Sequence, residues 1–312
     1  MFDPVGMVIV LGFGGLFAFL ATRAWKARNP AVRWVGTIGA GLLALACDGV
    51  AVAAGYGYVR IGATQPNPVP NVTVALTSEN VARGEKFVRV CAGCHSPNNS
   101  LPLIGNNFLG DAPLGTVYAP NLTPAHLGNW SDGEIIRAIR EGVHKDGRSL
   151  LFMPSGAFRS YSDEDVQAIV AYLRSMAPAG EPTPPNKLNL LGAIALGQNP
   201  PFSVQPPVTV EQSAPLAAAT LEYGDYLLTV VGCRDCHGAD LGGVVEVPNG
   251  PPSGPSLQDT AATWTKEQFI TAMRSGQLPD GDVLNEEMPY LGYEKLSDDD
   301  LLAMFFYIQT MK

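Results

Sequence analysis

The sequence has few cysteines, few histidines and few charged residues. Of its 312 residues, five are cysteine, four are histidine and 16% are charged. Four of the cysteines lie in two short clusters and the fifth, Cys47, lies in an apolar run, so the chain offers no disulfide framework. The formal net charge of −9 argues against nucleic acid as a partner, because phosphate binding needs a basic surface.

The two clusters are copies of the pattern Cys-x-x-Cys-His. They consist of Cys91, Cys94 and His95 in the first copy and Cys233, Cys236 and His237 in the second. Two thiols on one helical turn followed directly by an imidazole are typical of covalent attachment of a c-type haem. The thiols then bond to the porphyrin and the histidine ligates the iron. The sequence therefore predicts two covalently bound haem c groups and a role in electron transfer.

Two other roles for these clusters fit less well. A zinc site needs four ligands, and the only other histidines, His126 and His144, both lie in the first half of the chain. A thioredoxin-like dithiol has no need of a histidine in the next position, and here it occurs twice. The doubled pattern thus favours haem over zinc or a redox-active dithiol.

The first sixty residues are mostly apolar and contain two long runs, residues 5–21 and 34–58. Each run is close to the roughly 20 residues that a helix needs to cross a bilayer. Arg and Lys residues lie between the runs, which predicts that this short loop is cytoplasmic. The N-terminus and everything after the second run are then expected on the outer, periplasmic face of the cytoplasmic membrane, where haem c is attached.

Two alternatives to a membrane hairpin remain open. The first run resembles a cleaved signal peptide, although its basic residues follow it instead of preceding it. Residues 43–47 (LALAC) loosely resemble a lipoprotein cleavage site at Cys47, although the apolar run continues beyond it. Asp48 lies near the middle of the second run, where a carboxylate is costly; contact with the neighbouring helix is the simplest role for it.

An internal repeat organises the remainder of the chain. Outward from each haem motif, the two halves share a series of matched short segments. These pairs are residues 83–87 and 223–227, 120–122 and 255–257, 130–131 and 264–265, 135–142 and 269–276, 146–147 and 280–281, 153–154 and 288–289, and 162–165 and 297–300. The repeat predicts two tandem domains of one small helical fold.

Each copy is expected to contain three helices. The first, over residues 79–90 and 221–231, leads into the haem motif. Ser131 and Thr265 begin the middle helix with a capping box, since Glu134 and Gln268 follow three residues later. Ser162 and Ser297 begin the last helix, with Asp165 and Asp300 in the third position and apolar residues at helical spacing behind them.

The repeat also predicts the second axial ligand of each iron. Met153 and Met288 match each other, and both precede a proline. Met273 and Met304 align with isoleucines, while Met176 and Met311 recur at the end of a helix, where packing explains them. A thioether opposite histidine raises the reduction potential of a haem, and filling both axial positions leaves little use for oxygen or peroxide.

Four further residues are expected close to the haems. The carbonyl groups of Pro120 and Pro255 are placed to accept a hydrogen bond from the free ring N–H of each ligating histidine. Trp130 and Trp264 could donate their indole N–H to a haem propionate, or could simply pack in the core.

These residues resemble a known family. The duplicated Cys-x-x-Cys-His, Pro-Asn-Leu/Pro-Ser-Leu, Trp-Ser/Thr and Met-Pro pattern looks like class I cytochrome c domains. Residues 119–124 (APNLTP), 128–132 (GNWSD) and 140–143 (REGV) resemble the cytochrome c subunits of membrane-bound alcohol, aldehyde and gluconate dehydrogenases. That family usually has three haem motifs and no N-terminal hairpin. The arrangement is also similar to the dihaem subunit of cbb3-type oxidases and to cytochromes tethered to a quinol-oxidising complex.

The expected fold is mainly α. Residues 1–60 are assigned to a two-helix transmembrane anchor, 61–77 to a linker, 78–177 to cytochrome c domain 1, 178–219 to a Pro-rich linker and 220–312 to cytochrome c domain 2. An apolar segment within the second linker, residues 188–196, is expected to pack on a haem domain or a neighbour instead of floating free.

The sequence predicts an electron-transfer subunit, not an enzyme in its own right. It would relay single electrons between a membrane or dehydrogenase complex and another redox partner, with membrane lipid and other complex subunits as its contacts. Residues 220–312 hold fifteen acidic and five basic residues, so a basic partner suits this half. The alternatives are the dihaem subunit of a terminal oxidase or respiratory quinol-oxidising complex, and a dihaem peroxidase-like enzyme, which would need one open or His-ligated iron.

Overall fold

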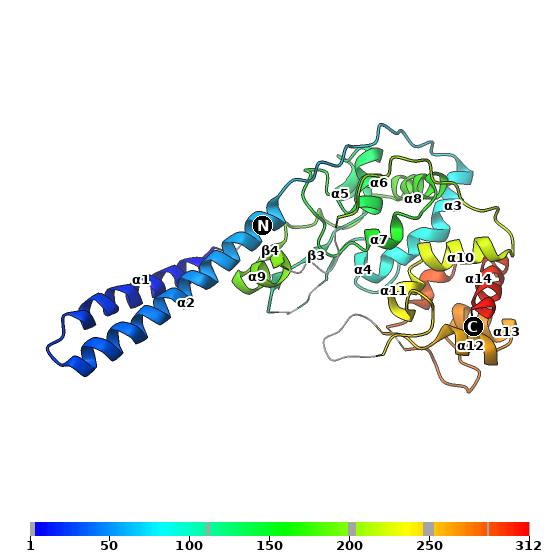
Figure 1. Ribbon diagram of the computed structural model, residues 1–312. Helices are drawn as coiled ribbons and strands as arrows, with labels where there is room; N and C mark the ends of the chain where they lie inside the picture. The colour runs from blue at the N-terminus through cyan, green and yellow to red at the C-terminus, as the bar shows by residue number, and fades with distance from the viewer. Residues whose placement is uncertain are drawn as a thin grey trace. The chain divides into compact units, whose positions relative to one another are not determined.

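Helices dominate the structure (Figure 1). The computed structural model describes residues 4–108, 110, 113–198, 204–245, 253–285 and 287–311. Two compact units form along the chain. The first unit comprises residues 1–64, 107–118 and 184–201; the second comprises residues 65–106, 119–183 and 202–312.

The first unit is built on a hairpin of two apolar helices, α1 (Val5–Trp25) and α2 (Pro30–Gly62). Both are long and apolar enough to cross a membrane, with mean hydropathies of 2.2 and 1.8. The side chain of Asn29 begins α2 by accepting a hydrogen bond from the backbone N–H of Ala31 at 2.9 Å. The two helices lie side by side (Figure 1), and most of their large apolar side chains are exposed.

Small residues let the two hairpin helices approach each other closely. A Cβ atom at Gly14 of α1 would lie 3.3 Å from both Asp48 Oδ1 and Cys47 Cβ of α2. Asp48 therefore lies against the neighbouring helix, as the simplest role for this carboxylate requires. The ring centroids of Trp25 and Trp34 lie 5.4 Å apart near the connecting loop.

The apolar segment after the first haem domain belongs to this same unit. It forms α9 (Leu190–Gln198), preceded by β4 (Lys187–Leu188), which pairs antiparallel with β2 (Gly115–Thr116). The expectation that this segment packs on a neighbour holds, since α9 packs against the last turns of α2. Gly57 permits this contact, because a Cβ there would overlap the backbone of Ala193.

The second unit contains both repeats. Its first repeat consists of α3 (Ser78–Val88), η1 (Arg89–Cys91), α4 (Ala92–His95), α5 (Pro124–Leu127), α6 (Asp132–Glu141), α7 (Ser155–Phe158) and α8 (Asp163–Ser175). The second repeat consists of α10 (Leu221–Val230), α11 (Cys233–His237), α12 (Leu257–Thr263), α13 (Lys266–Ser275), η2 (Tyr290–Tyr293) and α14 (Asp298–Thr310). Strands β1 (Asn106–Asn107) and β3 (Tyr118–Ala119) lie where the chain passes between the two units.

The first and last helices of each repeat cross at a glycine. A Cβ at Gly84 in α3 would overlap the carbonyl oxygen of Ala168 in α8, and a Cβ at Gly224 in α10 would overlap that of Ala303 in α14. The buried side chains of both repeats form one continuous core. The sequence-based prediction of a mainly α fold with two tandem cytochrome-like domains is thus confirmed.

The predicted helix caps are largely present. Complete capping boxes begin α6 at Ser131, α13 at Thr265 and α14 at Ser297. Ser162 caps α8, but its expected partner Asp165 turns away from the cap and bonds to other side chains. That difference arises at the contact between the two repeats.

We expect Gly84→Ala to lower the free energy of unfolding by about 2–3 kcal/mol, because the added methyl meets a backbone carbonyl that cannot move aside. Gly156→Ala is a suitable control: Gly156 is exposed on α7, and its Cβ would lie 3.9 Å from the nearest atom. Denaturant titration followed by circular dichroism would measure both changes. Equal midpoints for the two variants would contradict the tight helix crossing.

Candidate haem-binding sites

Each Cys-x-x-Cys-His motif forms a short helical turn at the end of the first helix of its repeat. In the first repeat, α3 continues through η1 into α4, and Cys91 is the last residue of η1. In the second repeat, Gly232 takes a left-handed conformation with φ of 82° and separates α10 from α11. The two copies therefore present the same residues through locally different backbone paths.

The histidine of each motif is buried and held in one orientation. His95 Nδ1 lies 2.7 Å from the carbonyl oxygen of Pro120, and His237 Nδ1 lies 2.8 Å from that of Pro255. Because a carbonyl only accepts hydrogen bonds, each Nδ1 must be the donor, and Nε2 keeps its lone pair. An imidazole with Nδ1–H fixed on a carbonyl is the usual state of a metal-ligating histidine.

Burial shifts the pKa of His95 and of the four haem-motif cysteines toward the neutral form of each group. Burial lowers the pKa of His95 to about 4, although its hydrogen bond to Pro120 opposes the shift. Burial raises the pKa of Cys91 and of Cys233 to about 12, and it also raises the pKa of Cys94 and Cys236. At neutral pH the first turn therefore presents protonated thiols beside a neutral His95 imidazole.

The sequence analysis missed a pair of glycines whose backbone N–H groups bind the carbonyls of the two motif histidines. The N–H of Gly105 donates to the carbonyl of His95 at 2.8 Å, and the N–H of Gly243 donates to that of His237 at 2.9 Å. Both glycines have positive φ, 86° and 91°, which other residues rarely adopt.

A sequence signal for these glycines existed. Each follows a leucine by two positions, Leu103 in the first repeat and Leu241 in the second, and both leucines are fully buried. The matching Leu-x-Gly was obscured because the spacing from the haem motif differs between the copies. Spacing shifts of this kind are common in loops, where insertions are tolerated.

The two matched methionines lie in identical turns. The N–H of Ser155 donates to the carbonyl of Met153, and the N–H of Tyr290 donates to that of Met288, both at 2.8 Å. The intervening prolines have φ and ψ of −77° and 56° and of −80° and 51°, which are values of an inverse γ-turn. Proline favours this turn because its ring fixes φ. Both methionines are half-buried and pack against the shared core.

The tryptophans of the repeat differ in their surroundings. Trp130 is buried, and its ring meets that of His144 edge-on with centroids 4.8 Å apart. Trp264 is half-buried at the end of α12 and packs against the core. The other extra histidine, His126, accepts a hydrogen bond at Nδ1 from the N–H of Thr183 at 3.3 Å. Burial lowers the pKa of both His126 and His144.

These residues fit a covalently attached haem. The first cysteine of each motif, the matched methionines and the matched tryptophans border one apolar core. Each motif histidine keeps an Nε2 lone pair for a metal. Bound haem would supply an iron that exchanges one electron between Fe(II) and Fe(III). The protein would hold it with Cys91, Cys94 and His95 in the first repeat and with Cys233, Cys236 and His237 in the second.

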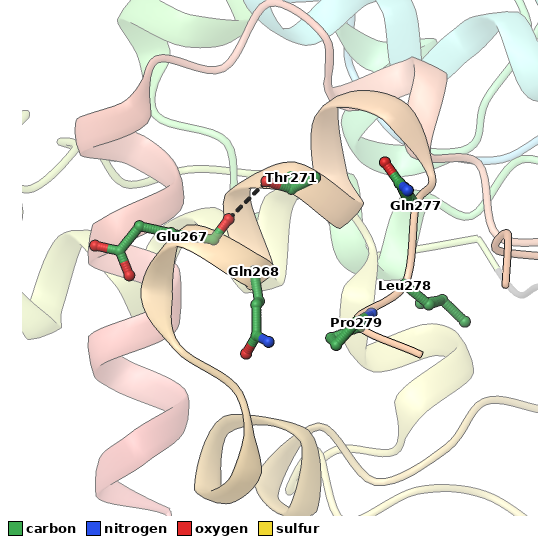
Figure 2. Close-up of a pocket in the computed structure, with 6 residues that line it drawn as sticks. All are labelled: Glu267, Gln268, Thr271, Gln277, Leu278 and Pro279. Carbon is green, nitrogen blue, oxygen red and sulfur yellow. Dashed lines mark hydrogen bonds between the residues drawn. The ribbon is translucent and has the colours of Figure 1, made fainter. Parts of the chain in front are cut away.

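A shallow pocket beside α13 is separate from the haem motifs (Figure 2). It is lined by Glu267, Gln268, Thr271, Gln277, Leu278 and Pro279. The Thr271 hydroxyl donates to the backbone carbonyl of Glu267 at 2.8 Å, a side-chain hydrogen bond within the wall. The residues of the haem motif are not part of this lining.

Comparisons with known proteins agree with the geometry. The family model described as cytochrome c matches twice, over residues 81–177 and 222–312. The chain is 27% identical over 262 residues to the cytochrome c subunit of the quinone alcohol dehydrogenase of Gluconobacter oxydans, which covers 74% of this chain and 54% of that subunit. It is 31% identical over 169 residues to the gluconate 2-dehydrogenase cytochrome c subunit of Pantoea cypripedii, with 50% and 37% coverage.

A third relative is a subunit of the nicotinate dehydrogenase of Pseudomonas putida, 30% identical over 206 residues, with 60% of this chain and 17% of that subunit covered. The chain thus spans about half or less of the length of these relatives. The two family matches together cover more than half of the chain, one for each structural repeat. The chain belongs to the cytochrome c family.

Proposed function

We propose that this protein is a membrane-anchored dihaem cytochrome that relays single electrons on the outer face of the cytoplasmic membrane. The main support is the matched pair of buried histidines. Each has Nδ1 hydrogen-bonded to a proline carbonyl, and each directly follows the second cysteine of a Cys-x-x-Cys pair. The same construction in both repeats supports two haems per chain, not one.

Met153 and Met288 are proposed as the second iron ligands. The support is their identical Met-Pro turn in the two repeats and their packing against the core that Cys91 and Cys233 also border. A histidine and a methionine together would fill both axial positions of each iron. Such a site favours the transfer of electrons over the binding of oxygen or peroxide.

The proposed partners are subunits of a membrane redox complex. Three relatives are named as cytochrome or other subunits of alcohol, gluconate and nicotinate dehydrogenases, which supports a dehydrogenase as electron donor. The excess of acidic over basic residues in the second haem domain supports a basic redox partner, which would be steered by charge.

The helices α1 and α2 are proposed to cross the membrane. Their length and apolar surfaces support this role, and the Arg and Lys residues at their connection support a cytoplasmic loop. Trp25 and Trp34 stack edge-on near that loop, where aromatic side chains favour a membrane interface. Both haem domains would then lie outside.

Stopped-flow mixing of the detergent-purified, fully reduced protein tests the relay against a peroxidase-like reaction. We expect rapid oxidation by a basic soluble electron acceptor, slowing as salt is added, because exposed charges are screened. Hydrogen peroxide should oxidise the protein slowly, since no iron has an open position. Rapid turnover with peroxide, together with a high-spin optical spectrum, would instead establish the enzyme.

A further inference from the structure

The two haem-binding repeats meet through the turns that carry their cofactor residues. The turn η1 ends at Cys91, and the turn η2 begins one proline after Met288. These two turns pack against each other. A Cβ at Gly292 of η2 would lie 3.5 Å from the Cα of Val90 and 3.6 Å from the carbonyl oxygen of Arg89. At this point backbone meets backbone with no side chain between them.

Charged side chains surround that contact and tie the repeats together. Arg89 Nη1 lies 3.1 Å from Glu294 Oε2, and Lys295 Nζ lies 3.4 Å from Glu85 Oε1. On the other side Lys86 Nζ lies 2.7 Å from the buried carboxylate of Asp300 and donates to the hydroxyl of Tyr223 at 2.7 Å.

The contact is approximately two-fold symmetric. Lys86 and Tyr226 occupy matching positions in the repeat, as do Asp165 and Asp300. Lys86 of the first repeat bonds to Asp300 of the second, while the Tyr226 hydroxyl of the second repeat donates to Asp165 of the first. Tyr226 also accepts from the N–H of Ser162 at 3.0 Å.

The backbone follows the same symmetry. Helix α3 packs on η2, and its counterpart α10 packs on α7, the turn after Met153. A two-fold contact places the same surface of each partner against the other. Each repeat therefore presents its haem-motif helix to the methionine turn of the other repeat.

We propose that the backbone contact between Val90 and Gly292 is the junction through which one electron passes between the two haem-binding domains. This inference rests on the proposed function, since it requires a haem in each domain. One domain loses an electron as its iron goes from Fe(II) to Fe(III), and the other gains it in the reverse change. No proton or bond change is involved. Gly292 keeps the junction close because any side chain larger than a methyl group would separate the two turns.

Variants of Gly292 test the junction in the full-length, haem-loaded protein. All are made in a Met153→His background, which separates the absorption and the potential of the two haems. A photoexcited ruthenium complex injects one electron, and its redistribution between the haems is followed optically. Gly292→Ala should redistribute the electron as the parent does, because 3.5 Å is an ordinary contact. Gly292→Val should slow redistribution several-fold, because it wedges the turns apart.

Gly156→Val is the matched control, since Gly156 lies in the corresponding turn of the first repeat and is exposed. Hydrogen–deuterium exchange at residues 89–91 and 290–294 reports independently whether the contact has opened. Faster exchange in Gly292→Val with an unchanged rate of electron redistribution would overturn the proposal. Unchanged exchange would also overturn it, because the turns would then have room for a side chain.

If Gly292→Val fails to fold, the double variant Glu294→Gln, Lys295→Gln loosens the same contact from its rim. It should raise hydrogen–deuterium exchange in the two turns and slow electron redistribution. Faster hydrogen–deuterium exchange with electron redistribution still at the parent rate would again overturn the proposal. Failure of the proposed function can be distinguished from failure of this inference. In that case the parent protein itself would contain fewer than two haems by pyridine haemochrome assay.

Discussion

Replacing Met153 or Met288 by leucine should abolish half of the weak far-red band that marks sulfur–iron ligation, and replacing both should abolish it completely. Each change should also lower the reduction potential of one haem by a sizeable part of the roughly 0.8 V that axial ligands span. The fold should persist, because leucine conserves the volume of methionine and such exchanges cost less than about 1.5 kcal/mol.

Met176→Leu and Met273→Leu are the matched controls. Met176 ends the last helix of its repeat, and Met273 is buried in α13; both pack in the core. Neither variant should change the far-red band or either potential in a spectroelectrochemical titration. A Met153→Leu protein that keeps the full band would show that another side chain ligates that iron.

Removing the charge of Lys86 should destabilise the paired haem domains strongly. In Lys86→Met the carboxylate of Asp300, whose side chain is 5% exposed, loses its cationic partner. Breaking a buried ion pair from one side costs about 3–5 kcal/mol, and the partial exposure of Lys86 places this case near the lower end. The measurement is chemical denaturation of the haem-loaded protein, followed by tryptophan fluorescence.

Lys266→Met provides the control for loss of a lysine. Its ammonium lies 3.8 Å from Glu267 in an exposed pair, which contributes at most about 1 kcal/mol. Adding Asp300→Asn to Lys86→Met should recover part of the loss, because the unpaired charge is then gone, although Asp300 also caps α14. Equal destabilisation by Lys86→Met and Lys266→Met would contradict the described contact between the repeats.

The sequence predicted the local structure of this protein well. Haem motifs and helix caps are signals within a few residues, and the repeat doubled each of them. The capping boxes at Ser131, Thr265 and Ser297 follow from short-range chemistry, so no tertiary information was needed. The proline carbonyls were identified by matching the two copies, and they lie against the histidines.

The contacts that the sequence did not predict are those between distant segments. Asp165 has the sequence context of a capping-box residue, yet Arg83 and Tyr226 compete successfully for its carboxylate. Helix α9 is recognisable in the sequence only as an apolar segment, and its partner α2 lies more than a hundred residues earlier in the chain. Local helix propensity predicts neither the partners of Asp165 nor the packing of α9 on α2, since both depend on which surfaces the fold brings together.

The central claim is that each repeat holds one haem. Pyridine haemochrome assay and intact mass of the purified chain measure this directly. The account predicts two covalently attached haems per polypeptide, falling to one in a Cys91→Ala, Cys94→Ala variant and to one in a Cys233→Ala, Cys236→Ala variant. A parent chain with a single haem, or with haem that organic solvent extracts, would contradict it.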